Sequence, residues 1–174
     1  WREYAGVELV PLLGDREAIA KLAKEKFGQA VTSEDDWDDI YFKIFLAEIE
    51  PKIEAGEPTF LYRYPASMAA LARKSADDER WADRVELYAG GLELANGFAE
   101  LSDPVEQRKR FEEEQELRRG LGKEVWDIDE ELLSALPKMG KAAGIAFGVD
   151  RLVMLICGAK SINEVIPFSA NERL

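Results

Sequence analysis

The sequence has no histidine and a single cysteine among its 174 residues. Without histidine the usual general base near neutral pH is missing, so serine-histidine and cysteine-histidine hydrolases are excluded. Any chemistry must use carboxylates, arginines, metal ions or backbone groups. One cysteine can form neither a disulfide framework nor a cysteine metal site. Because Cys157 lies in the apolar run 152–157, we expect it to be buried in a core.

Long apolar runs and basic clusters are also missing. No stretch of eighteen apolar residues occurs, and residues 1–4 show no signal-peptide pattern, so we expect a cytoplasmic protein without membrane contact. The net charge of -12 would on average repel phosphate backbones, which disfavours direct nucleic-acid binding. The 47 % hydrophobic content suffices for a single packed domain over residues 1–174.

The first third of the chain predicts two helices. Asp15 can cap a helix that ends at Gly28. Aromatic and aliphatic residues repeat at helical spacing from Trp37 to Ile49, before the helix breaker Pro51. We interpret this stripe as core rather than as a ligand site.

Strand patterns follow. Residues 59–64 alternate as a strand that ends at Pro65, and residues 84–88 and 92–95 predict an antiparallel hairpin that turns at Ala89-Gly90-Gly91. The sequence therefore predicts that the sheet is built largely from neighbouring segments of the chain.

Further helices and one more strand complete the pattern. Asp103-Pro104 opens a charged helix to about Arg119, and a short helix over 129–136 is expected to turn Leu132, Leu133 and Leu136 inward. A strand over 144–149 precedes an apolar helix that Asp150 can cap. This order favours an α+β fold with a mainly antiparallel sheet flanked by helices.

Four polar residues interrupt the apolar hairpin: Glu86, Glu93, Asn96 and Glu100. Glu86 and Glu93 lie on opposite arms, where a modest register places them side by side. Such a pair suits Mg²⁺ together with phosphate oxygens and so favours a nucleotide substrate. A bulge at Asn96-Gly97 could turn Asn96 and Glu100 toward the same cavity. Alternatively the carboxylates line a solvated face of the sheet, and spacing alone does not decide between the two.

The second cluster, residues 144–151, alternates small side chains before an aspartate and an arginine at a helix start. Gly148 could admit a purine against the sheet, and Arg151 could point its fork at a triphosphate. Alternatively this is a glycine-lined packing contact in which Asp150 and Arg151 form a cap and a surface ion pair. Taken alone, the second interpretation is favoured, because short glycine patterns are common.

Together the clusters resemble the lysine branch of the class II aminoacyl-tRNA synthetases. Residues 144–151 are similar to the third signature motif, and 93–101 resemble the segment that binds ATP, metal and amino acid. Residues 64–72 resemble the strand and loop before that segment. The similarity covers about 35–174 and implies the C-terminal half of that catalytic domain.

Two subfamilies of this branch are similar to the chain: lysyl-tRNA synthetases and the elongation factor P (R)-β-lysine ligases. The segment Glu93-Leu94-Ala95-Asn96-Gly97 resembles the ligases, since synthetases usually show isoleucine-glycine in place of Leu94-Ala95. Ala146 stands where synthetases usually carry glycine, and its methyl group would reshape the amino-acid pocket. Asp38-Asp39 and the segment 164–169 also look ligase-like.

The resemblance implies roles for the residues of both clusters. Glu86 and Glu93 would hold Mg²⁺ and ATP, with Leu94 contacting the nucleotide through its backbone. Asn96 and Glu100 would grip the amino acid beside Ala146, Gly148 would lie against adenine, and Arg151 would bind the terminal phosphate. Glu93 and Arg151 would be the catalytic residues. Ala99 departs from the histidine or serine often found there.

In the family reaction, the carboxylate of lysine or β-lysine attacks the α-phosphate of ATP and forms an acyl-adenylate. A ligase then passes the acyl group to a lysine of elongation factor P, and a synthetase passes it to tRNA, which is the less favoured acceptor. Nothing before Thr32 resembles the family's first motif, a dimer helix, or its second. We therefore expect that the 174 residues alone do not form adenylate. A non-catalytic nucleotide-binding or homodimerisation module is the alternative.

Overall fold

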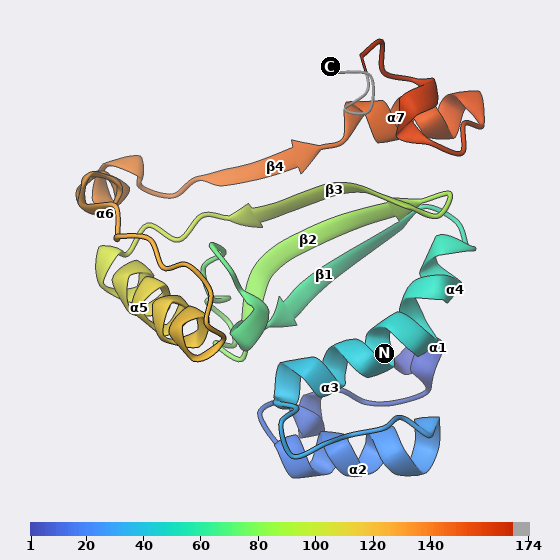
Figure 1. The fold of residues 1–174 in the computed structure, drawn as a ribbon, viewed down its shortest axis with the longest axis horizontal. Coiled ribbons are helices and arrows are strands. Elements are labelled where there is room, and N and C mark those ends of the chain that lie inside the picture. The colour runs from blue at the N-terminus through green and yellow to red at the C-terminus, as the bar shows by residue number, and fades with distance from the viewer. Residues whose placement is uncertain (169–174) are drawn as a thin grey trace.

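In the computed structural model, which describes residues 1–168, helices surround an antiparallel sheet (Figure 1). The 4-stranded sheet has the order β1-β2-β3-β4. Its strands are β1 Thr59–Pro65, β2 Trp81–Ala89, β3 Leu92–Ala99 and β4 Ala143–Phe147. The expected α+β class with a mainly antiparallel sheet is confirmed.

The N-terminal helices gather beside β1 (Figure 1). They are α1 Arg2–Ala5, the 3-10 helix η1 Val10–Leu12, α2 Arg16–Phe27, α3 Trp37–Ile44, the π-helix η2 Phe45–Ile49 and α4 Glu50–Glu54. Asp15 caps α2 as predicted, since its carboxylate accepts from the Ala18 backbone N–H at 2.9 Å. Gly28 ends α2 in the left-handed conformation, with φ of 63°.

The stripe on α3 and η2 forms the centre of the core, as predicted. Ile40, Tyr41, Ile44, Phe45 and Ile49 are all buried and pack together with the helices before them. Burial raises the pKa of the Tyr41 hydroxyl to about 12. The aromatic stripe is therefore core, not a ligand site.

The prediction that Pro51 stops this helix is wrong. The chain continues helically because Pro51 falls in the first turn of α4, where its missing N–H is not needed. The wide turn of η2 lies just before it, and the Glu50 N–H bonds the Phe45 carbonyl across that turn.

The hairpin turns where the sequence predicts. Gly90 and Gly91 have φ values of 59° and 79°, which glycine adopts without steric cost, and the two residues connect β2 to β3. Both strands are longer than predicted, so Asn96 and Gly97 lie inside β3. On the other side of β2, the strand β1 has a register shift at Arg63, whose φ is 61°. The 3-10 helix η3 Ala66–Met68 follows β1.

The C-terminal part contains α5 Pro104–Gly120, α6 Glu130–Met139, α7 Val149–Cys157 and the 3-10 helix η4 Ile162–Glu164. Asp103 caps α5. Leu133 and Leu136 are buried as predicted, whereas the prediction for Leu132 is wrong, since it is 43 % exposed. The segment 164–169 is described only up to residue 168, so Ser169 lies outside the described residues.

Two predictions for α7 are also wrong. Gly148 occupies the cap position without a side-chain hydrogen bond, and Asp150 falls within the first helical turn. Cys157 is exposed, and among the residues of α7 only Met154 is buried.

The far edge of the sheet has little cover among residues 1–168. Ile145 and Phe147 on β4 are 62 % and 44 % exposed, and Ile156 on α7 is 74 % exposed. In this part of the chain β4 pairs only with β3, so its outer edge is open. Within the same residues, no helix combines the length and hydrophobicity needed to span a bilayer.

Replacing a core isoleucine should destabilise the protein. Ile44→Ala removes a side chain that is 0 % exposed and should lower the free energy of unfolding by about 2–5 kcal/mol. Ile156→Ala makes the same chemical change at an exposed helical site and should change it by less than about 0.5 kcal/mol. Urea unfolding followed by circular dichroism measures both, and equal losses would contradict this location of the core.

Candidate active site

A cavity of about 310 Å³ lies where β3, β4 and the start of α7 meet. Every predicted site residue except Glu86 and Glu100 lines it. The lining residues are Glu93, Leu94, Ala95, Asn96, Ala146, Phe147, Gly148, Asp150, Arg151 and Ile162. Two clusters that lie far apart in the sequence thus form one concave surface. If the carboxylates of the first cluster only lined a solvated face of the sheet, the two clusters would not need to meet.

Backbone contacts hold the start of α7 against β3. The Gly148 N–H donates to the Leu94 carbonyl at 2.8 Å, and Nη1 of Arg151 donates to the Glu93 carbonyl at 2.7 Å. A Cβ at Gly148 would lie only 3.3 Å from Cδ of Arg151. Glycine at this position therefore leaves room for the arginine beside the cavity.

Behind the cavity lies a carboxylate that the protein itself neutralises. Glu86 is 6 % exposed, and its Oε1 accepts from Nη2 of Arg84 at 2.6 Å and from Nδ2 of Asn96 at 3.3 Å. Its Oε2 accepts from the Tyr88 hydroxyl at 2.7 Å. Burial, followed by the hydrogen bond to Glu86, raises the pKa of Tyr88, so this hydroxyl stays protonated and donates.

The register differs from the prediction for Glu86 and Glu93. Glu86 lies opposite Asn96 and Glu93 lies opposite Tyr88, so the two carboxylates are not cross-strand partners. The predicted bulge at Asn96-Gly97 is also wrong. Both residues stay in the ladder, and the irregularity falls between Leu87 and Tyr88. There Leu87 and Tyr88 of β2 face the three residues 93–95 of β3. The extra residue in β3 allows Glu93 and Asn96 both to line the cavity.

Asp150 also lines the cavity, but the Glu93 carboxylate is the acidic group there that the sequence predicts as a ligand. Within residues 1–168 it makes no hydrogen bond or ion pair, although it lines the cavity. The same residues contain no group of three or more metal-ligating side chains. A hard cation could bind Glu93 and Glu86, with its remaining ligands from phosphate or water.

The second predicted amino-acid ligand, Glu100, lies beyond the far end of β3. Its backbone bridges Ala72, and its Oε1 lies 2.8 Å from the place a Cβ of Gly144 would occupy. Asn96 and Glu100 are four residues apart on an extended segment and share a face. Ala146 and Gly144 pair with Asn96 and Phe98, so the small side chains here belong to β4, while Phe98 shares the face of β3 with Asn96 and Glu100.

Sequence reasoning did not identify Arg84 and Tyr88. The alternation Arg84, Glu86, Tyr88 could have indicated them, because residues two apart on a strand share a face. A buried carboxylate between an arginine and a tyrosine is the pattern of a paired polar group rather than of a solvated one.

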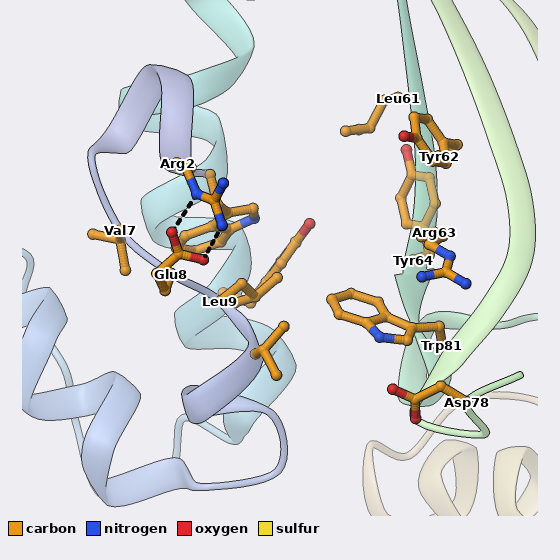
Figure 2. A pocket seen from close by; sticks show the side chains of 13 residues that line it. Arg2, Val7, Glu8, Leu9, Leu61, Tyr62, Arg63, Tyr64, Asp78 and Trp81 are labelled. Atoms are coloured by element: carbon orange, nitrogen blue, oxygen red, sulfur yellow. Dashed lines mark hydrogen bonds and ion pairs between the residues drawn. The ribbon is translucent and has the colours of Figure 1, made fainter.

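A larger cavity of about 450 Å³ lies between the N-terminal segment and β1 (Figure 2). Aromatic side chains line much of it, and its charged groups are already paired: Arg2 with Glu8, and Arg63 with Asp77. None of the predicted site residues lines it. The cavity at β3 and β4 is therefore the candidate active site.

Comparison with known proteins identifies the family of the chain. Residues 15–172 match the family model of class II tRNA synthetases (D, K and N). The chain is 43 % identical over 168 residues to an elongation factor P--(R)-beta-lysine ligase of Photorhabdus laumondii subsp. laumondii. The aligned region covers 95 % of this chain and 52 % of that protein. The chain is 44 % identical over 171 residues to the protein of that name from Sodalis glossinidius, covering 97 % and 52 %. The chain thus spans about half the length of these relatives.

The contact between β3 and β4 should tolerate no side chain at Gly97. A Cβ there would lie 2.7 Å from the Gly144 carbonyl oxygen and 2.9 Å from Cβ of Ile145. Gly97→Ala should therefore push β4 away and lower the free energy of unfolding by about 1–3 kcal/mol. Hydrogen exchange should quicken at the amides that join the two strands.

The control is Gly120→Ala at the end of α5, where a Cβ would meet nothing within 4 Å. Stability should stay the same or rise by up to about 1 kcal/mol, because alanine favours a helix. Unchanged exchange across β3 and β4 in Gly97→Ala would contradict the close approach of these strands.

Proposed function

The chain belongs to the class II tRNA synthetases (D, K and N), and on this premise we propose that it provides the C-terminal part of a catalytic domain that joins ATP to lysine or β-lysine. One observation carries the proposal: the cavity gathers Glu93, Asn96, Gly148 and Arg151 from two distant parts of the chain. This set combines a free carboxylate, a carboxamide, an open backbone and a cation.

The nucleotide occupies the part of the cavity beside α7. Gly148 and the backbone of Leu94 accept the flat adenine ring, since no side chain projects from Gly148. Arg151 is exposed at the cavity and donates to the terminal phosphate. Glu93 and Glu86 are the residues that would hold Mg²⁺, which would neutralise phosphate charge.

The amino acid lies along the face of β3. Asn96 holds one end and Glu100 accepts a hydrogen bond from an ammonium group at the other. The small side chains of Gly144 and Ala146 on β4 leave room for an aliphatic chain beside Phe98, which lies between Asn96 and Glu100 on this face of β3. This arrangement suits a lysine, which carries a positive charge at the end of a methylene chain.

In the first step a carboxylate oxygen of the amino acid forms a bond to the α-phosphorus of ATP, and the bond to pyrophosphate breaks. Arg151 stabilises charge on the phosphates, and the ligands along β3 align the attacking oxygen. In the second step a lysine amine of elongation factor P attacks the acyl carbon, AMP leaves, and the amine loses a proton. No side-chain nucleophile is needed, which agrees with a cavity without histidine.

Elongation factor P is proposed as the acceptor because the two relatives are named as its ligases. The net charge of -12 also disfavours a polyanionic acceptor such as tRNA. The protein purified from its own cells is incubated with ATP, (R)-β-lysine and either elongation factor P or tRNA. Mass spectrometry of elongation factor P should show one added β-lysyl group. Aminoacylation of tRNA in its place would make the protein a lysyl-tRNA synthetase.

Removing the arginine at the cavity should weaken ATP binding. Arg151→Ala deletes a charge-assisted hydrogen bond to phosphate and should raise the Kd of ATP about 10- to 100-fold in calorimetry. Arg119→Ala, on the exposed face of α5 where Arg119 pairs with Glu116, serves as the control and should bind ATP like the wild type. Equal affinities of all three proteins would contradict this nucleotide site.

A further inference from the structure

The guanidinium of Arg84 is held on several sides directly behind the cavity. Besides Glu86, it reaches the Met68 carbonyl through Nη1 at 3.2 Å and Oδ1 of Asn96 through Nε at 3.4 Å. Its Cζ lies 4.4 Å from the centre of the Tyr64 ring. The side chain is 19 % exposed, so Arg84 has little freedom to move toward a ligand.

Asn96 lies between this cation and the Glu86 anion. Its Nδ2 donates to Oε1 of Glu86 at 3.3 Å, and its Oδ1 accepts the longer hydrogen bond from Arg84. A reversed carboxamide would place Nδ2 against the Arg84 donor and Oδ1 against the Glu86 carboxylate. Both contacts would then be repulsive, so the ion pair allows one orientation of the amide.

We propose that Arg84 is a positioning residue that fixes which end of the Asn96 carboxamide the amino acid meets. This inference rests on the proposed function only in taking Asn96 as an amino-acid ligand. With Nδ2 engaged by Glu86, the second lone pair of Oδ1 remains to accept from an ammonium group. An amide free to turn over would present its N–H groups to the ammonium group as often as its oxygen, and a contact between N–H and ammonium is repulsive.

Arg84 has a second effect on a cationic substrate. Glu86 without a counter-charge would attract an ammonium group into the wrong place behind Asn96. The ion pair at 2.6 Å weakens that attraction for a singly charged ammonium group, whereas Glu93, Asp150 and Glu100 have no such counter-charge among the described residues. The pair thus selects where the positive end of the substrate lies.

The fork of arginine is needed for this role, and its charge alone is not enough. The guanidinium donates in three directions at once, to Glu86, to Asn96 and to the Met68 carbonyl. A lysine ammonium could neutralise Glu86, but it is a compact point charge that does not span these acceptors. Arg84→Lys therefore separates positioning from neutralisation.

The experiment follows the side-chain amide of Asn96 by ¹⁵N nuclear magnetic resonance in the ligand-free chain, with Asn96→Ala identifying the signals. In the wild type the two amide protons should be resolved and exchange slowly with solvent. In Arg84→Lys they should move toward the shifts of a solvated asparagine amide and exchange faster with solvent, while backbone amides remote from β2 and β3 keep their shifts. Calorimetry should show a Kd for (R)-β-lysine or L-lysine about 10-fold higher and an ATP affinity within about 2-fold.

The matched control is Arg73→Lys, because Arg73 also pairs with a carboxylate, Asp83, at 3.1 Å, but outside the cavity. It should leave the Asn96 signals and both affinities unchanged. If Arg84→Lys does not fold, Glu86→Gln removes the other half of the pair and should release the same amide. The proposal would be overturned if a folded variant kept the Asn96 signals and the amino-acid affinity of the wild type. If the wild type binds neither amino acid, the proposed function fails, whereas the amide signals still decide the role of Arg84.

Discussion

The ion pair between Arg84 and Glu86 is the constraint on which the geometry of the site depends. A carboxylate that is 6 % exposed is costly unless hydrogen bonds and an opposite charge compensate for its lost hydration. Here two partners of Glu86, Arg84 and Tyr88, lie two residues before and after it on the same strand. A slip of β2 by one residue would move Glu86 to the opposite face and separate it from Asn96. In the observed register the pair fixes the amide beside the cavity.

The irregularity between β2 and β3 follows from two demands on one strand. Asn96 must stay in the ladder opposite Glu86, while Glu93 must reach the cavity three residues earlier. Strict alternation would place residues three apart on opposite faces. One extra residue of β3 resolves the conflict, and it does so next to the tight turn at Gly90-Gly91. The bulge is therefore a functional part of the hairpin.

Local signals predicted much of the fold, and tertiary context explains the errors. Asp15, Gly28 and the Gly90-Gly91 turn act through their own backbone chemistry, so sequence alone located them. The exposure of Cys157 depends on what packs against α7, which no local pattern records. For the site, composition left a tie between a magnesium pocket and a solvated face, and only the family resemblance favoured the pocket. The Arg84 contacts required the register, which is set by packing and by the turn together.

The two walls of the cavity differ in how firmly they are held. The wall at Glu86 and Asn96 belongs to inner strands and is fixed by several hydrogen bonds around a buried charge. The wall at Gly148 and Arg151 follows an edge strand, and backbone contacts of 2.8 and 2.7 Å tie it to β3. An edge strand with exposed apolar side chains is held from one side only. Rigid elements hold ligands more accurately than mobile ones, so the face proposed to meet the amino acid is the more firmly preformed of the two. The proposed nucleotide side depends on fewer contacts.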